Sequence, residues 1–389
     1  EEAAIEYDIN VGPEGMTCIR IDLEILRSLC LEQTFRDPSS AQSFVSRLHT
    51  KSFALAEEIE MESLTTVAKL GEGGFGSVFL MGDEAAGKEY ALKRMSKHFI
   101  QQAEVVEQVC SERDILSFLD SPFIVRFFCS YSDSASVYML MEAAGGGNLY
   151  ELLCDHGDVL FDGQDCGSAA QFYVACISSA LGYLHERHIA YRDLKLENVL
   201  LNHQGYAKLC DLGFARFVLG KTHTFLGTAD YMAPEIIDPP HYHDASADWW
   251  SVGVLAFELI CGQTPFDDEG LEDTEERLLA IRRSQEHGDL HFTPDCPPAA
   301  KLFIAQLLRR LPWRLGANGG AKAVRKHQFF QQLHFDFDAL HKRELPAPIR
   351  CPWTEPNKEH GEGWVQFAVK DDDPFVKYED DDSNWDRDF

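Results

Sequence analysis

The sequence is poor in positive charge and has no long hydrophobic run. Lysine and arginine together number 35, against 64 aspartates and glutamates, and the formal net charge is -29. A nucleic-acid-binding protein needs a basic surface to neutralise phosphates, so this composition argues against that function and favours cationic partners. No apolar stretch approaches the roughly 20 residues of a membrane-spanning helix, so we expect no membrane span.

Cysteine pairs and a targeting segment are also missing. The eleven cysteines are scattered, with no Cys-x-x-Cys pair, which is typical of reduced thiols in a cytoplasmic protein. The chain opens with Glu-Glu-Ala-Ala and lacks the basic and apolar segments of a secretory signal, so we expect no such signal. The missing Met indicates a fragment or a processed chain. Hydrophobic residues make up 45% of the sequence, which is enough for a sizeable core.

Predicted strands come before predicted helices along the chain. Stretches typical of strands are Leu64–Leu70, Ser77–Met81, Glu89–Arg94, Ile124–Ser130 and Val137–Met141. One predicted helix, Val105–Leu119, interrupts them. From Gly145 onward helical patterns prevail, for example in Ala169–Glu186 and Ala245–Cys261. The order predicts an α+β protein with a small β-rich lobe and a larger helical lobe, followed by an acidic, irregular tail.

A glycine-rich segment, Leu70–Val78, lies between two predicted strands and reads LGEGGFGSV. Glycine has no Cβ, so backbone N–H groups in such a loop can approach phosphates closely. The same spacing of glycines also occurs in dinucleotide sites, where the loop opens a helix. Here Ser77–Leu80 continues as a strand, which weakens the dinucleotide interpretation.

Two charged residues follow at positions that are uninformative in isolation. Lys93 ends the apolar strand segment Tyr90–Lys93, and Glu112 lies on the only predicted helix nearby. Such a lysine could be a surface side chain whose stem covers apolar neighbours, and such a glutamate could be solvated. A functional role for Lys93 and Glu112 is indicated only by the order of the surrounding motifs.

The strongest motif is Tyr191–Asn198, which reads YRDLKLEN. Asp211-Leu212-Gly213 follows it, and Ala233-Pro234-Glu235 comes later. Carboxylate and amide oxygens are suitable ligands for Mg²⁺. Asn198 of the first motif and Asp211 of the second therefore suggest a magnesium site. An isolated Asp-Leu-Gly would mean little, but the glycine loop, the strand lysine, the helix glutamate and these three motifs occur in one order.

This ordered set resembles the protein kinase superfamily and, within it, the group that contains the cAMP- and cGMP-dependent kinases. The group resemblance is carried by YRDLK at 191–195, DLGFA at 211–215 and THTFLGT at 222–228. Residues 138–143 and the ending NWDRDF are similar to cGMP-dependent kinases in particular. The resemblance implies a two-lobed kinase fold that uses ATP and Mg²⁺ to phosphorylate serine or threonine in proteins.

The resemblance also implies roles for individual residues. The implied catalytic residues are Asp193, Lys195, Lys93 and Glu112. The implied nucleotide-binding residues are Gly71, Gly73, Gly74, Phe75, Gly76, Val78, Ala91, Lys93, Met141, Glu142 and Ala144. The implied metal ligands are Asn198 and Asp211. The implied activation site is Thr224, whose phosphate would be clamped by Arg192 and Arg216. The implied substrate contacts are Glu197, Asp230 and Glu258, and the implied structural residues are Glu235, Asp248 and Arg314.

By the same resemblance the chain divides into five parts. They are the end of a cyclic-nucleotide-binding domain (1–35), a helical linker (36–62), the small lobe (63–143), the large lobe (144–333) and a C-terminal tail (334–389). The implied partners are proteins with basic residues upstream of the phosphorylated site, and regulation by a cyclic nucleotide would act through domains before this chain. The terminal Phe389 either docks on the small lobe or stays exposed.

Some positions depart from the family pattern. Asn148 stands where these relatives carry a glutamate that binds an upstream arginine, Leu212 replaces a phenylalanine, and Gln108 replaces a histidine. None of the departures removes a catalytic or metal-binding residue, so an active kinase is favoured over a non-catalytic scaffold of the same fold. A cAMP-dependent type of catalytic subunit is the rival within the enzyme class, and the NWDRDF ending disfavours it.

Overall fold

The computed structural model divides the chain into two units, Glu1–Ser52 and Phe53–Phe389. The residues that it describes all belong to the second unit: 59–73, 76–160, 166–218, 227–238, 241, 243–266, 274–288, 290–332, 334–349, 385–387 and 389. The predicted remnant of a cyclic-nucleotide-binding domain, 1–35, therefore lies outside the described residues, as does most of the predicted linker.

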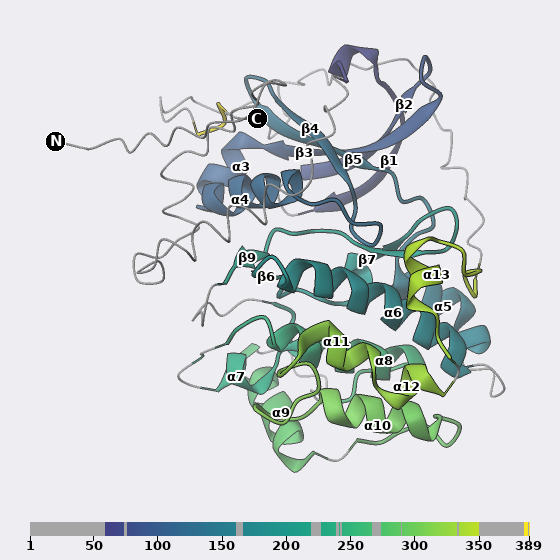
Figure 1. Cartoon of the computed structure of the whole chain (residues 1–389). Helices are drawn as coiled ribbons and strands as arrows, with labels where there is room; N and C mark the ends of the chain where they lie inside the picture. Colours follow the sequence, from purple (N-terminus) through teal and green to yellow (C-terminus); the bar gives the residue numbers. More distant parts are fainter. Residues whose placement is uncertain are drawn as a thin grey trace, which may run out of the picture. The chain divides into compact units, whose positions relative to one another are not determined.

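A five-stranded antiparallel sheet opens the second unit (Figure 1). Its strands, in chain order, are β1 Thr65–Gly73, β2 Gly76–Asp83, β3 Lys88–Ser96, β4 Phe127–Ser132 and β5 Ser136–Glu142. In space they follow the order β1-β2-β3-β5-β4. Tyr90 and Leu92 on β3, and Tyr138 and Leu140 on β5, lie two residues apart and share one buried cluster, because alternate strand residues point to the same face.

Two helices lie beside this sheet, where the sequence predicted one. They are α3, Lys97–Gln102, and α4, Val106–Ser117. The Ser96 side chain accepts a hydrogen bond from the Phe99 backbone N–H and so caps the start of α3. A helix of six residues is too short to show periodicity, which is why the prediction missed it.

The fourth strand begins later than predicted. Ile124 and Val125 were expected to open it, but β4 starts at Phe127. Instead, the Val125 N–H donates to the Leu209 carbonyl at 2.9 Å, and Leu209 N–H donates to Phe123 O at 2.8 Å. The apolar segment before β4 thus pairs with a strand of the helical lobe.

Helices dominate the rest of the second unit (Figure 1). They are α5 Leu149–Leu160, α6 Cys166–His185, α7 Pro234–Ile237, α8 Ala247–Cys261, α9 Thr274–His287, α10 Pro298–Leu307, α11 Gly320–Arg325, α12 Gln328–Gln331 and α13 Phe337–His341. Two short hairpin-like pairs accompany them, β6 Ile189–Ala190 with β9 Arg216–Phe217, and β7 Val199–Leu201 with β8 Ala207–Leu209. Short 3-10 turns are η1 Met61–Ser63, η2 Leu196–Asn198 and η3 Ala229–Tyr231. The predicted two-lobed α+β fold is confirmed.

The core of the helical lobe is built around α8. Nearly all its residues are buried, Trp249 and Trp250 among them, as its almost continuous apolar sequence requires. It packs against α6 and α10. Among the described residues, no helix is both long enough and apolar enough to cross a membrane.

The C-terminal residues return to the small lobe. The Lys97 ammonium lies 2.5 Å from Asp386 Oδ2, and Ser132 donates a hydrogen bond of 2.6 Å to the same oxygen. Burial opposes ionisation of Asp386, but these hydrogen bonds hold its pKa below the usual value. The Arg113 guanidinium lies over the Phe389 ring at 4.7 Å, a cation–π contact. Phe389 therefore docks rather than staying exposed.

One buried ion pair joins the start of α7 to the loop that follows α10. Both Arg314 terminal nitrogens contact the Glu235 carboxylate, at 2.5 and 2.8 Å. The Arg314 side chain is fully buried, and it also donates to the carbonyls of Arg309 and Ser246. A bidentate pair in which all three guanidinium nitrogens donate hydrogen bonds fixes both segments.

We expect Arg314→Ala to lower the free energy of unfolding by about 3–5 kcal/mol, because Glu235 and two carbonyls lose their partner inside the protein. Denaturant unfolding measures this loss. The control is Arg310→Ala, which removes an exposed guanidinium 2.9 Å from Asp238. That change should cost less than about 1 kcal/mol. Equal losses for the two variants would contradict a special role for the buried pair.

Candidate active site

The sheet register gathers four of the predicted nucleotide-binding residues. Val78 on β2 pairs with Lys93 on β3, and Ala91 on β3 pairs with Met141 on β5. These strand pairings place the apolar residues beside the lysine, at the end of the sheet where β5 leads into Glu142. The arrangement can offer an apolar surface to a flat ring and a cation to phosphates.

Two glycines of the glycine-rich segment have different surroundings. A Cβ at Gly76 would collide with the backbone carbonyl of Arg94, so the fold itself excludes other residues there. At Gly71 no atom lies within 4 Å of where a Cβ would stand, so packing does not demand glycine. Open space at this glycine, near the end of β1, leaves room for a ligand to approach the backbone. Gly74 and Phe75 lie outside the described residues.

Lys93 and Glu112 form an ion pair between β3 and α4. The Lys93 ammonium lies 2.7 and 2.9 Å from the two oxygens of the Glu112 carboxylate. Burial alone would lower the pKa of Lys93, but the Glu112 and Asp211 carboxylates outweigh it, so this pKa lies above its usual value. The lysine is therefore a permanent cation at the edge of the site.

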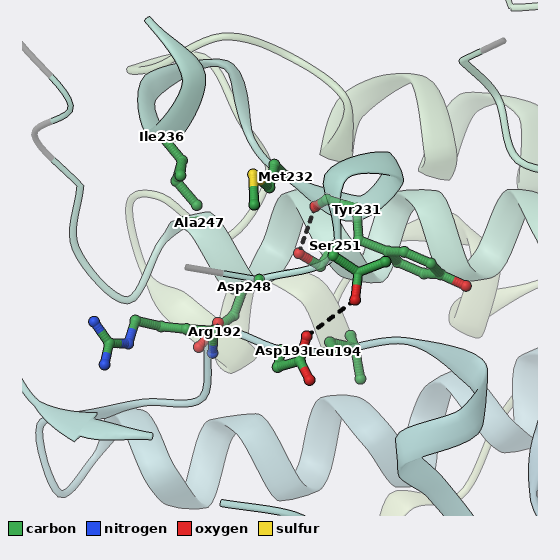
Figure 2. Close-up of a pocket in the computed structure, with 11 residues that line it drawn as sticks. Arg192, Asp193, Leu194, Tyr231, Met232, Ile236, Ala247, Asp248 and Ser251 are labelled. Carbon is green, nitrogen blue, oxygen red and sulfur yellow. Dashed lines mark hydrogen bonds between the residues drawn. The ribbon is translucent and has the colours of Figure 1, made fainter. Parts of the chain in front are cut away.

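Asp193 is buried and held from two sides. Its Oδ2 accepts a hydrogen bond of 2.7 Å from the Asn198 amide, and its Oδ1 accepts one of 3.2 Å from the Thr228 hydroxyl. Lys195 Nζ lies 3.4 Å from Asp193 Oδ2 and donates to Thr228 Oγ1 at 3.2 Å. Figure 2 shows Asp193 beside a small cavity lined also by Tyr231. The four side chains fix a carboxylate next to a cation.

Asp248 supports this loop from the start of α8. Its Oδ2 accepts the Tyr191 N–H at 2.9 Å and its Oδ1 accepts the Arg192 N–H at 2.8 Å. The His185 ring nitrogen lies 2.7 Å from Oδ2. Asp248 is 1% exposed, so one buried carboxylate sets the path of the backbone into Asp193. The sequence analysis did not single out His185, which ends a long helix and belongs to none of the motifs.

Asn198 and Asp211 are brought together by a backbone hydrogen bond. The Cys210 N–H donates to the Asn198 carbonyl at 3.1 Å, which sets the two candidate ligands on adjacent segments. Asp211 has φ +49, an uncommon value for a residue other than glycine. An amide and a carboxylate are hard oxygen donors that fit Mg²⁺, and phosphate oxygens and waters can complete its shell. Among the described residues, no group of three or more His, Cys, Asp or Glu could hold a metal.

Arg192 is a buried cation with capacity for an anion. Its Nε donates to the Phe214 carbonyl at 2.7 Å, while its Nη1 is buried with no hydrogen-bond partner. Burial, and then the neighbouring Arg216, lower the pKa of Arg192 to about 10. Two adjacent guanidinium groups suit a phosphate, which is the role predicted for them. Thr224, the predicted source of that phosphate, lies outside the described residues.

A further ion pair lies at the connection between the lobes. Lys208 on β8 is 2% exposed, and its ammonium lies 2.8 Å from Glu142 Oε2. The Glu142 backbone N–H donates to Arg126 O at 2.8 Å. The pair therefore fixes Glu142, one of the predicted nucleotide-binding residues. Lys208 was not among the predicted site residues, because it belongs to none of the motifs.

The predicted substrate contacts have different environments. Glu197 on η2 is exposed. Asp230 on η3 forms an ion pair with Arg277, at 2.8 Å. Glu258 on α8 accepts a hydrogen bond from the Tyr231 hydroxyl. Burial, and then the negative charges of Glu197 and Asp230, raise the pKa of Glu258 to about 7, although the Tyr231 hydrogen bond opposes the shift.

The family model described as a protein kinase domain matches residues 64–330. The chain belongs to the protein kinase family. The match begins just before the five-stranded sheet and ends in α12, so it covers both lobes. The candidate site residues described above all lie within the matched segment.

Individual relatives fall in the cyclic-nucleotide-dependent group of kinases. The chain is 36% identical over 315 residues to cAMP-dependent protein kinase type 3 of Saccharomyces cerevisiae, covering 79% of this chain and 75% of that protein. It is 35% identical to an isozyme 2 form of cGMP-dependent protein kinase from Drosophila melanogaster, over 97% of this chain and 39% of that protein. It is 38% identical to a cGMP-dependent protein kinase of Toxoplasma gondii, over 85% of this chain and 32% of that protein. The chain thus spans about a third to two fifths of these cGMP-dependent relatives.

We expect Lys93→Met to abolish phosphoryl transfer to peptides, because Glu112 loses its partner and the site loses a phosphate-binding cation. Steady-state assays with Mg·ATP measure the loss. Lys88→Met is the matched control, since Lys88 opens the same strand and is exposed. Comparable activity in the Lys93 variant and the control would rule out the role assigned to Lys93.

Proposed function

We propose that the chain is an active serine/threonine kinase that transfers the γ-phosphoryl group of ATP to protein hydroxyls. The observation that carries the proposal is the fixed Asp193 carboxylate, 4% exposed and held by Asn198 and Thr228, with the Lys195 ammonium beside it. A scaffold that only binds nucleotide has no need for a hydroxyl-orienting carboxylate and a neighbouring cation. The intact set therefore favours catalysis over the scaffold alternative.

In the proposed mechanism each residue has a limited task. Lys93, held by Glu112, positions the α- and β-phosphates of ATP. Asn198 and Asp211 would hold magnesium, which would supply positive charge to neutralise the phosphates. Asp193 accepts a hydrogen bond from the substrate hydroxyl and aligns it for attack on the γ-phosphorus. The hydroxyl oxygen forms the new bond to the γ-phosphorus and its proton passes to the Asp193 carboxylate, while the bond to the β-phosphate oxygen breaks and ADP leaves.

Lys195 has a complementary task in this mechanism. The Lys195 ammonium donates to Thr228 Oγ1 at 3.2 Å, and this hydrogen bond holds it beside the Asp193 carboxylate before substrate binds. There it can offset negative charge that develops on the transferred group. Asp193 therefore acts on the attacking hydroxyl, and Lys195 acts on the phosphoryl group that is transferred.

Regulation in the manner of cGMP-dependent kinases is part of the proposal. The alignment with the Drosophila cGMP-dependent kinase extends over 385 residues, well beyond the 64–330 segment common to protein kinases. This supports reading residues 1–35 as the end of a nucleotide-binding domain, 36–62 as a linker and 334–389 as a kinase tail. The rival subtype is a cAMP-dependent catalytic subunit, and the 75% coverage of the yeast kinase favours it.

The Asp193→Asn variant tests the catalytic proposal. We expect it to bind ATP with nearly wild-type affinity but to lose most phosphoryl transfer, because the amide cannot act on the hydroxyl proton as a carboxylate does. The experiment measures labelled phosphate transfer to an arrayed Ser/Thr peptide library, alongside ATP binding by calorimetry. Wild-type protein that binds ATP and carries a phosphorylated Thr224, yet transfers nothing, would favour the scaffold.

The pH dependence of substrate binding tests the role proposed for Glu258. The raised pKa, about 7, means that the residue is largely neutral at pH 6 and largely a carboxylate at pH 8. We therefore expect the KM for a peptide with upstream arginine to fall several-fold as pH rises through 7. Glu258→Gln should flatten this trend. An identical pH profile in the variant would remove Glu258 from substrate binding.

A further inference from the structure

The substrate-facing acids differ in what already neutralises them. Asn148, in place of the usual glutamate, is engaged at the start of α5, where its Oδ1 accepts the Glu151 N–H at 2.9 Å and its own N–H donates to Glu151 Oε2 at 3.1 Å. That reciprocal pair is a helix-capping arrangement. This position is therefore committed to the protein's own helix.

Asp230 is an acid that already has a partner within the protein. Arg277 Nη2, on α9, lies 2.8 Å from Asp230 Oδ2. The Asp230 side chain is 16% exposed, so the pair is partly shielded from water and is screened less than a surface pair. A substrate arginine would pair its own guanidinium with this carboxylate in the same way. Arg277 thus has the chemistry of the ligand that the site is proposed to bind.

The neighbouring contacts indicate that α9 does not depend on this pair for its attachment. Gln285, further along α9 and 7% exposed, donates to the Met232 carbonyl at 2.9 Å. Arg282 Nε lies 2.7 Å from Asp238 Oδ1, just after α7. Two other contacts therefore hold the helix against the segment that follows η3.

We propose that Arg277 is a specificity-determining residue. Its ion pair with Asp230 takes the place of a substrate arginine and so lowers the preference of the enzyme for peptides with an upstream arginine. The inference rests on the proposed function, since it assumes that Asp230 faces a peptide substrate. Glu197 and Glu258 then remain as the acids available to a basic residue. A substrate arginine can engage Asp230 only by displacing Arg277, which cancels much of its electrostatic gain.

Removing Arg277 should release this restraint. Near Glu258, the negative charges of Glu197 and Asp230 are close enough to raise the pKa of that carboxyl, so the three acids share one electrostatic environment. Loss of Arg277 leaves the cluster more negative and Asp230 open to a substrate guanidinium. We expect selectivity to sharpen at one upstream position, the one whose side chain reaches Asp230.

The test measures kcat/KM for serine peptides in an uncharged background that carry a single arginine at each upstream position in turn. Relative to the peptide without arginine, Arg277→Ala should raise the preference at one position by about tenfold. Arg277→Lys, which keeps the charge, should stay within about twofold of the wild type. Arg282→Ala is the matched control, because Arg282 lies on the same helix, pairs with an aspartate and is 39% exposed against 38% for Arg277.

The outcomes separate this proposal from the proposed function. An Arg277→Ala profile equal to that of active wild-type protein would overturn the inference and leave the kinase assignment standing. The same gain in Arg282→Ala would overturn it too, since a general change of charge would then explain the effect. No transfer by wild-type protein to any peptide would overturn both.

A double variant gives the same test independently. Adding Asp230→Asn to Arg277→Ala should abolish the gained preference, because the carboxylate that receives the substrate arginine is gone. A gain that persists would locate it elsewhere and contradict the proposal. If Arg277→Ala fails to fold by circular dichroism, Arg277→Gln, which keeps length and polarity without charge, replaces it in every comparison.

Discussion

The buried carboxylate of Asp248 is the contact on which the active site depends. It accepts the N–H groups of Tyr191 and Arg192 and lies against the His185 ring, and it stands at the start of the almost fully buried helix α8. Arg192 has φ +69, a backbone conformation that costs free energy unless its surroundings enforce it. A carboxylate at the start of the buried helix α8 thus enforces the turn that places Asp193.

From that turn, short contacts spread to the rest of the site. Asp193 accepts hydrogen bonds from Asn198 and Thr228, the Asn198 carbonyl accepts one from the Cys210 N–H, and the next residue is Asp211, a candidate metal ligand. The candidate catalytic and metal-binding residues are therefore ordered by one chain of hydrogen bonds that begins in the core. The small lobe adds Lys93, which its own partner on α4 holds in place. Phosphoryl transfer needs such positioning more than it needs reactive side chains.

The sequence was sufficient for the fold class and for the residues that carry motifs. Lys93, Asp193 and Asp211 could be proposed as site residues because phosphate and metal chemistry would restrict their type and order. The helix α3, with six residues, left no periodicity to read. Ion pairs such as Arg277–Asp230 and Lys208–Glu142 join residues 47 and 66 positions apart. No local pattern announces such a pair, because each partner alone looks like an ordinary surface charge.

The segment before β4 has a mechanical consequence for the two lobes. Phe123 and Val125 exchange backbone hydrogen bonds with Leu209 on β8, and Glu142, at the end of β5, is tied to Lys208. The start of β4 and the end of β5 are therefore attached to the large lobe, although the rest of both strands belongs to the sheet of the small lobe. Any change in the angle between the sheet and the helical lobe must therefore bend β4 and β5 beyond these contacts, because the sheet cannot rotate as a rigid body while they hold.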